Sequence, residues 1–204
     1  MKDITYINNW LKENLSEKRY THTLGTATCA RELAQKYNLD SDKAYIAGLL
    51  HDCAKCFSNE KLLEIIKNHL NVEECEMLNY KTLHAPVSAY IAEKEFGIDD
   101  KEILSAIRWH TLGKLDMTDF EKIVFLADKI EPNTRDKEYS DKVRELLEED
   151  NGLNKAILRC YKETIKSLVK RAPQWLEMCN ESLLPNELKD RLIKIITERA
   201  ETIK

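Results

Sequence analysis

Apolar residues recur at three- and four-residue intervals along nearly the whole chain, as in the stretches AYIAGLL and KIVFLADKI. This spacing gathers apolar side chains on one face of an α-helix, whereas a half-buried strand would alternate apolar and polar residues. Glycine and proline, which interrupt helices, number only 5 and 4. The pattern predicts an all-α fold, with helices at about 3–14, 17–37, 41–54, 59–69, 72–79, 85–96, 99–109, 117–130, 138–149, 151–171, 173–182 and 185–203.

Several of these helices carry start and stop signals. Ser41 is a suitable N-cap, and Pro86 suits the first turn of the helix that it opens. Gly97 and Gly113 each follow an apolar periodic segment, where a glycine commonly ends a helix. These signals support the predicted boundaries.

The chain length of 204 residues suits one domain with a substantial core. The composition changes after about residue 135, where histidines cease and Glu/Lys pairs dominate. We therefore expect a functional core over residues 1–135 and a helical C-terminal flank over 136–204, packed on that core within a single domain.

The overall charge is mildly acidic, with 36 Asp and Glu against 32 Lys and Arg, so nothing favours nucleic acid or an anionic membrane as partner. No apolar run approaches the roughly 18 to 20 residues that span a bilayer, and the N-terminus lacks the apolar core of a signal peptide. Six cysteines are too few for a disulfide scaffold. We expect a cytoplasmic protein with reduced thiols.

The stretch AGLLHDCAK places His51 and Asp52 side by side in a predicted apolar helix. Adjacent helix residues point about 100° apart, so the two side chains cannot satisfy each other, but they can share an ion. Asp128 lies in a core-helix pattern, where an unpaired carboxylate is costly. Taken alone, Asp128 could instead pair with Lys129 or Arg108.

Four of the five histidines lie among apolar residues, whereas His69 follows polar residues at a predicted helix end. Any one of the four could be an ordinary core histidine. Four such histidines together with interior aspartates are harder to explain in that way, and they favour a metal site built by the fold. The candidate residues are His22, His51, Asp52, His84, His110 and Asp128.

The order of these residues resembles the H…HD…D signature of the HD-domain metal-dependent phosphohydrolases, which are helical bundles. Five phrases resemble, more closely, the YqeK-type bis(5′-nucleosyl)-tetraphosphatases: RYTHTLG, AGLLHDCAK, LHAPVSAYIAEKEFGI, AIRWHTLG and EKIVFLADKIEPN. The likeness covers about residues 8 to 180. It implies an HD-domain bundle that hydrolyses diadenosine tetraphosphate, or a related dinucleoside polyphosphate, symmetrically to ADP or another nucleoside diphosphate such as GDP.

The resemblance also implies roles for single residues. It assigns an iron ion to His22, His51, Asp52 and Asp128, and it places His84, His110 and Thr111 at the phosphates of the nucleotide. Further substrate contacts that it implies are Arg135 and the segment Arg171, Ala172, Pro173 and Gln174, where RAPQW stands in place of a longer phrase of the family. His22 and Gly113 are also candidate substrate contacts, Gly113 because a close backbone approach at the end of a helix suits phosphate.

Histidine and carboxylate ligands without thiolate suit Fe, Mn, Co or Zn. A single octahedral ion bound by all six candidates would have no position for water, so the candidates must be divided. His84 and His110 then hold either phosphate or a second ion bridged by Asp52. The first ion would lower the pKa of water from 15.7 to about 7, and Asp52 or Asp128 would orient the hydroxide that attacks phosphorus.

Two cationic residues have helical spacing to these candidates. Lys55 follows Asp52 by three residues and would share its helix face, so its ammonium could reach a phosphate. Arg19 precedes His22 by three residues and could act likewise. Both could equally be solvated helix charges, and Gly113 could be a simple C-cap.

Other interpretations remain open at this point. Cys53 and Cys56 have the CxxC spacing of a zinc or redox motif, although no second cysteine pair follows. Alternative functions are an HD-type nucleotidase, a cyclic-nucleotide phosphodiesterase, or a nucleotide-binding sensor without catalysis. The sequence also leaves open whether the chain forms a homodimer.

Overall fold

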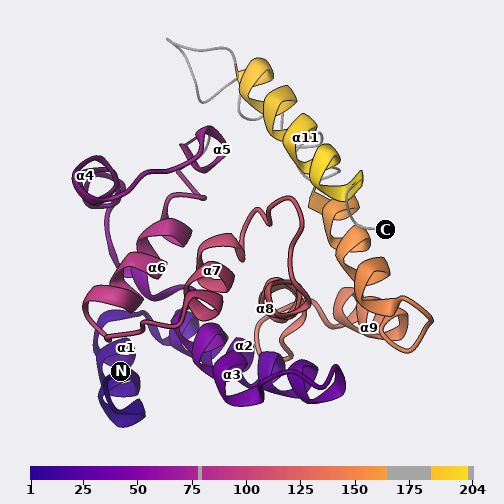
Figure 1. The fold of residues 1–204 in the computed structure, drawn as a ribbon, viewed down its shortest axis with the longest axis horizontal. Coiled ribbons are helices and arrows are strands. Elements are labelled where there is room, and N and C mark those ends of the chain that lie inside the picture. Colours follow the sequence, from indigo (N-terminus) through magenta and orange to yellow (C-terminus); the bar gives the residue numbers. More distant parts are fainter. Residues whose placement is uncertain (78–79, 165–184, 202–204) are drawn as a thin grey trace.

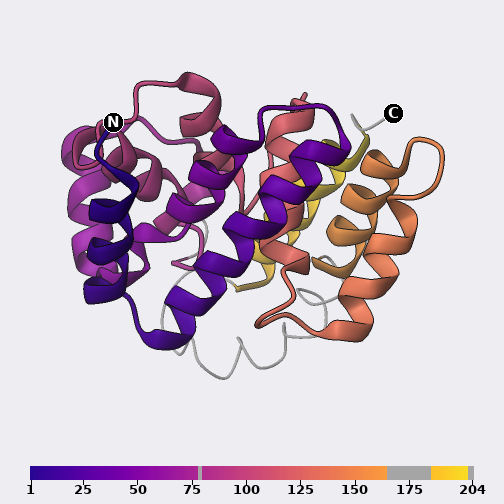
Figure 2. The same cartoon turned by 90° about the horizontal axis from the view of Figure 1, so that it is seen from below.

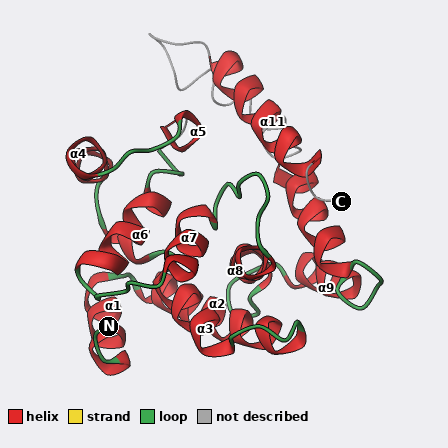
Figure 3. Ribbon diagram, in the orientation of Figure 1, coloured by secondary structure: helices red, strands yellow, loops and turns green. Residues whose placement is uncertain are grey.

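The computed structural model describes residues 1–77, 80–164 and 185–201, and within these ranges it consists of helices and loops without a strand (Figures 1 and 3). The predicted all-α fold is confirmed. The helices are α1 (Ile4–Asn14), α2 (Glu17–Lys36), α3 (Ser41–Leu50), the 3-10 helix η1 (Cys53–Cys56), α4 (Asn59–His69), α5 (Glu74–Met77), α6 (His84–Lys94), α7 (Lys101–Trp109), α8 (Asp119–Ile130), α9 (Lys137–Leu146), a helical segment at 152–164, and α11 (Pro185–Glu201).

Side-chain caps fix where several helices begin. Asp40 caps α3 and Asp100 caps α7, each by accepting hydrogen bonds from backbone N–H groups of the first turn. Thr118 and Glu121 form a reciprocal capping box at the start of α8. The cap of α3 lies within one residue of the predicted start of that helix, and the caps of α7 and α8 lie within two residues of theirs. The sequence predicts these starts because capping depends only on neighbouring residues.

The long helix α2 crosses the molecule diagonally, with α1 near one end and the helices of 137–164 near the other (Figure 2). It packs against α3 and α8, and α7 packs against α6 and α8. Gly48 allows the close crossing of α2 and α3, because a Cβ atom there would lie 2.8 Å from the Cα of Ala27. The bundle thereby brings the N-terminal part of α2 close to α8.

The predicted helix 41–54 is wrong at its C-terminal end. Helix α3 stops at Leu50, His51 and Asp52 lie in a turn, and the chain continues as η1. The hydroxyl of Ser88 on α6 accepts a hydrogen bond from the backbone N–H of Ala54 at 3.1 Å. Ser88 therefore accepts the backbone N–H that a continuous helix would have bonded within itself. Neither a glycine nor a proline follows Leu50 within the next few residues to indicate the end of the helix from the sequence.

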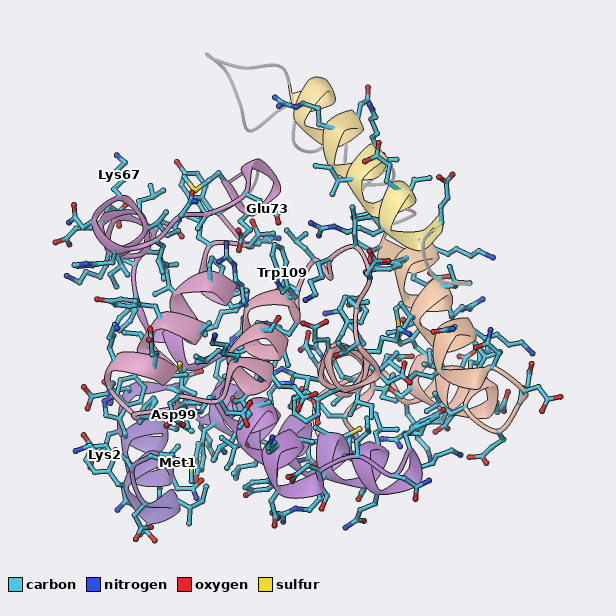
Figure 4. The ribbon with its side chains drawn as sticks, viewed as in Figure 1. Met1, Lys2, Lys67, Glu73, Asp99 and Trp109 are labelled. Atoms are coloured by element: carbon cyan, nitrogen blue, oxygen red, sulfur yellow. The ribbon has the colours of Figure 1, made fainter. Side chains whose placement is uncertain are left out.

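The C-terminal flank consists of α9, the segment 152–164 and α11 (Figure 1). The predicted helix 173–182 lies outside the described residues. Of the one predicted at 72–79, residues 72 and 73 are not helical, Glu74–Met77 form α5, and residues 78–79 lie outside the described residues. Arg199 of α11 is buried, and its Nη1 donates to the carbonyls of Leu112 and Gly113 at 3.0 and 2.5 Å. Its guanidinium also lies over the ring of Trp109, 5.3 Å from the centroid, and Figure 4 shows Trp109 on the side of the bundle that faces α11.

The division of the chain at residue 135 stays a prediction. In the described part of the chain, none of the helices is both long enough and apolar enough to cross a bilayer.

Candidate metal centre

Five elements bring the candidate residues together in the interior of the bundle. His22 comes from α2, the pair His51 and Asp52 from the turn after α3, and His84 opens α6. The turn after α7 supplies His110, and the last turn of α8 supplies Asp128. All six side chains are buried, with residue exposures of 6% or less: His22, His51, Asp52, His84, His110 and Asp128. His69 is instead exposed at the end of α4, stacked on Tyr90.

The first cluster consists of His22, His51 and Asp52, whose ligand atoms all lie within 4.8 Å of one another. The Nε2 atoms of His22 and His51 are 3.3 Å apart, and Asp52 Oδ2 lies 3.9 and 3.6 Å from them. Asp128 adds its Oδ1 at 3.0 Å from His22 Nε2 and 3.7 Å from His51 Nε2. Four potential ligand atoms thus surround one point.

The second cluster shares Asp52 with the first and adds His84 and His110. Asp52 Oδ1 lies 3.0 Å from His84 Nε2 and 3.4 Å from His110 Nε2, and these two nitrogens are 3.1 Å apart. The two oxygens of Asp52 therefore face different clusters, which is the arrangement of a bridging carboxylate.

Hydrogen bonds at the far side of the imidazole rings fix the direction of their lone pairs. His51 Nδ1 lies 2.6 Å from the carbonyl of Gly48, and His110 Nδ1 lies 2.7 Å from that of Ile107. A carbonyl only accepts, so each Nδ1 carries a proton and the neutral ring has its lone pair at Nε2. Metal-binding histidines are commonly oriented in this way.

The spacing of the first cluster fits one cation. Ligands held at roughly 2.1 Å from an ion lie about 3.0 Å apart as neighbours in an octahedron and about 3.4 Å apart in a tetrahedron. The distances of His22 Nε2 to Asp128 Oδ1 and to His51 Nε2, 3.0 and 3.3 Å, fall in that range, and three other distances among the four atoms are longer, at 3.6 to 3.9 Å. A cation would also relieve the repulsion between facing imidazole lone pairs.

The electrostatics of the site favour ionised carboxylates and neutral side chains at two of the histidines, His84 and His110. Burial would raise the pKa of Asp52, but His51, His110 and His84 hold that pKa well below its usual value. Burial also opposes ionisation of Asp128, and Lys129 and His22 outweigh it, so its pKa is likewise well below the usual value. Burial lowers the pKa of His110 to about 4, against the opposing effect of Asp52. Metal binding requires ionised carboxylates and neutral histidines, which these four residues provide. At His51 burial lowers the pKa, but the carboxylates of Asp52 and Asp128 outweigh it and raise the pKa, so a cation would have to displace a proton there.

Asp128 also takes part in ion pairs. Its Oδ2 lies 2.5 Å from the ammonium of Lys129, and its Oδ1 contacts Nη2 of Arg135, whose Nε donates to the Asp128 carbonyl at 2.5 Å. Of the two ordinary partners considered from the sequence, Lys129 is therefore present, whereas Arg108 pairs with Glu76 at 2.6 Å. The carboxylate of Asp128 thus forms ion pairs with Lys129 and Arg135 and also lies beside the first cluster.

The cations expected near the phosphates are placed differently from each other. Arg19 Nη1 lies 3.2 Å from Asp52 Oδ2, and its side chain is 47% exposed, so it reaches the cluster from the solvent side. Lys55 lies on η1 and not on a continuation of α3, so the helix-face argument for it was wrong. Burial lowers the pKa of Lys55, an effect that the nearby carboxylate of Asp52 opposes. Both side chains belong to the surroundings of the site.

The turn after α7 carries two further candidates. The hydroxyl of Thr111 lies 3.0 Å from His110 Nε2 and 3.3 Å from His84 Nε2, so it adjoins the second cluster. Gly113 has φ +65, and a Cβ atom there would overlap the hydroxyl of Tyr161. Gly113 therefore serves the backbone turn, while its N–H donates to the carbonyl of Trp109 at 2.7 Å.

Other predicted residues do not join the site. The thiols of Cys53 and Cys56 donate to the carbonyls of Ser88 and Cys53, and burial raises the pKa of the Cys53 thiol, so neither has the thiolate character of a zinc ligand. The predicted substrate segment lies outside the described residues: Arg171, Ala172, Pro173 and Gln174.

Glu131 is a buried residue at the site that the sequence did not reveal. Its Oε1 lies 3.0 Å from His22 Nδ1, although 109 positions separate the two residues. The only hint was its place in the phrase EKIVFLADKIEPN, three residues after Asp128.

Comparison with known proteins identifies this arrangement. The family model of the HD domain matches residues 19–133, more than half of the chain. The chain belongs to the HD-domain family. Every candidate ligand of this HD domain, from His22 to Asp128, lies within the matched range.

The HD-domain protein is also similar to proteins of two bacteria that share one enzyme name. It is 42% identical over 161 residues to the symmetrical bis(5′-nucleosyl)-tetraphosphatase of Bacillus subtilis, covering 79% of this chain and 85% of that protein. It is 38% identical over 160 residues to the enzyme of the same name from Staphylococcus aureus, covering 78% and 82%. The closer resemblance seen in the sequence is confirmed.

A crystal structure from Clostridium acetobutylicum has the same fold as this HD-domain protein. That protein is described as a predicted HD superfamily hydrolase involved in NAD metabolism. It is 38% identical, with a TM-score of 0.78, and the alignment covers 95% of this chain and 98% of that one. The likeness extends beyond the matched family region, into the C-terminal flank.

Proposed function

We propose that this protein is a metal-dependent hydrolase that cleaves diadenosine tetraphosphate, and related dinucleoside polyphosphates, symmetrically into two nucleoside diphosphates. Relatives that carry this name cover most of the chain at 38 to 42% identity. The observation that carries the proposal is Asp52, a buried carboxylate whose two oxygens face two histidine clusters. Such a site suits phosphoryl transfer to water, which needs a cation beside the attacked phosphorus.

The first ion would be held by His22, His51, Asp52 and Asp128. Iron is favoured by the family resemblance, and the same nitrogen and oxygen donors suit Mn, Co or Zn. When bound, the ion supplies an activated water and offsets the negative charge that develops on the phosphoryl oxygens.

The chain's own residues then orient the water and the phosphates. The ionised carboxylate of Asp52 accepts a hydrogen bond from the attacking water and directs it toward phosphorus. Lys55, Arg19 and Arg135 supply positive charge around this carboxylate and that of Asp128. Lys55 has no hydrogen-bond or ion-pair partner among the described residues, so its ammonium can bind a phosphate oxygen. Thr111 adds a hydroxyl donor beside the second cluster.

His84 and His110 have one of two roles in this proposal. They bind either a bridging phosphate of the substrate or a second ion that shares Asp52 with the first. The metal content per chain distinguishes these roles, because the first requires one ion and the second requires two. The cytosolic location, the oligomeric state and a nucleotide contact from residues 171–174 stay predictions.

Product analysis with diadenosine tetraphosphate tests the function. The purified protein, supplied with Fe²⁺ or Mn²⁺, should release ADP as the sole nucleotide product, and chelation or the Asp52→Ala substitution should abolish turnover. AMP together with ATP would show asymmetric cleavage and contradict the proposal. Tight nucleotide binding without turnover would indicate the sensor, and preferential hydrolysis of nucleoside monophosphates or cyclic nucleotides would indicate the other HD activities.

A further inference from the structure

Glu131 follows the last residue of α8 and is completely buried, with 0% of its surface exposed. A buried carboxylate is costly unless hydrogen bonds satisfy its oxygens. The mechanism above assigns it no task, since it does not belong to either ligand cluster.

The surroundings of Glu131 fix its carboxylate in one orientation. Oε2 accepts the backbone N–H of Asn133 at 2.6 Å, and Oε1 accepts the backbone N–H of Thr134 at 3.0 Å as well as its hydroxyl. Oε1 also lies 3.0 Å from His22 Nδ1. The loop after α8 therefore holds the carboxylate, and His22 is its partner from the other side of the bundle.

The backbone of α2 leaves room for this carboxylate at Gly25. A Cβ atom at Gly25 would overlap Oε2 of Glu131 and would lie 2.8 Å from Nδ2 of Asn133. Gly25 follows His22 by three residues, so the two lie on the same face of the helix. Gly25 on α2 thus leaves space for the carboxylate of Glu131 at the Nδ1 side of the His22 ring.

We propose that Glu131 is a positioning residue, whose carboxylate accepts the Nδ1 proton of His22 and so directs the His22 Nε2 lone pair toward the metal ion. Carboxylate, histidine and metal then form a linear series, in which the carboxylate holds the ring and increases its basicity. This inference rests on the proposed role of His22 as a metal ligand and does not depend on which phosphate ester is the substrate.

Metal titration of the metal-free protein tests this role. Glu131→Gln keeps the size of the side chain and an acceptor oxygen but removes the charge, and we expect its affinity for Mn²⁺ or Zn²⁺ to fall about tenfold to hundredfold, as measured by competition with a chelating indicator. Glu121→Gln is the matched control, because Glu121 is also a buried glutamate but lies in the first turn of α8, where it binds Thr118, Ser105 and Lys114. The control should bind metal like the wild type.

A second measurement separates positioning from a general effect on folding. In the zinc-loaded wild-type protein, the Nδ1 proton of His22 should give a slowly exchanging NMR signal, which should move upfield in Glu131→Gln because a neutral acceptor bonds more weakly. If that variant does not fold, Gly25→Ala offers the same test, since its added methyl group displaces the Glu131 carboxylate without removing any ionisable group. Unchanged metal affinity and an unchanged His22 signal would overturn the inference.

The outcomes also distinguish this inference from the proposed function. Weaker metal binding in Glu131→Gln, with a wild-type protein that releases no ADP, would support the positioning role and contradict only the substrate. Wild-type metal affinity in the variant, with a protein that cleaves diadenosine tetraphosphate symmetrically, would contradict only the positioning role.

Discussion

Replacing Lys55 by Met deletes one positive charge beside the site and preserves much of the apolar stem. Lys55 lies on η1, three residues after Asp52, and its side chain is half-buried. Within the described ranges its ammonium has neither an ion-pair nor a hydrogen-bond partner, in contrast to Arg19, which binds Asp52. We therefore expect the ammonium to be available for a phosphate oxygen of the substrate.

The expected effect follows from that single contact. A hydrogen bond to a charged group contributes roughly 1.5 to 3 kcal/mol, and about 1.4 kcal/mol corresponds to a tenfold change in rate. If the contact forms in the transition state, Lys55→Met should lower kcat/KM about tenfold to hundredfold. Partial exposure of the side chain to solvent favours the lower end of this range.

The assay measures ADP release from diadenosine tetraphosphate together with the metal content of each preparation. Metal content should equal that of the wild type, because Lys55 provides no ligand atom. Lys61→Met is the control, since Lys61 is exposed on α4 and pairs with Glu64 at 3.0 Å. Wild-type kinetics in Lys55→Met would refute the reasoning and show that the ammonium remains solvated during turnover, whereas loss of metal would show that it has a structural role.

Three further changes test other parts of the structure. Asp52→Ala should remove both metal and turnover while circular dichroism still reports a helical protein, and retained metal would contradict the bridging position of this carboxylate. Cys56→Ser should keep metal content and activity within about twofold of the wild type, because its thiol only donates to a backbone carbonyl; zinc loss with unfolding would restore the CxxC interpretation. Arg199→Met should raise KM for the nucleotide more than it lowers kcat, because Arg199 holds the carbonyls of Leu112 and Gly113 beside the second cluster; an unchanged KM would show that α11 does not influence this turn.

The sequence by itself determined the features that depend on neighbouring residues. The helical class, and the start of α8 to within two residues, follow from apolar periodicity and from the reciprocal bonds of Thr118 and Glu121, which are three positions apart. The ligand types could also be predicted from the sequence, because histidines and aspartates in apolar segments need a hydrogen-bond, ion-pair or metal partner once they are buried. Their division into ligand and phosphate groups came from the family resemblance and not from spacing.

Tertiary structure decided what depends on partners distant in the chain. The end of α3 at Leu50 is accompanied by a hydrogen bond from the backbone N–H of Ala54 to the hydroxyl of Ser88, 34 positions further along the chain, and this break places Lys55 on η1 instead of on a continuation of α3. The contact between His22 and Glu131 joins residues 109 positions apart. No local pattern encodes such a pair, because a buried carboxylate behind a histidine is stabilised only once the bundle has closed and removed both groups from water.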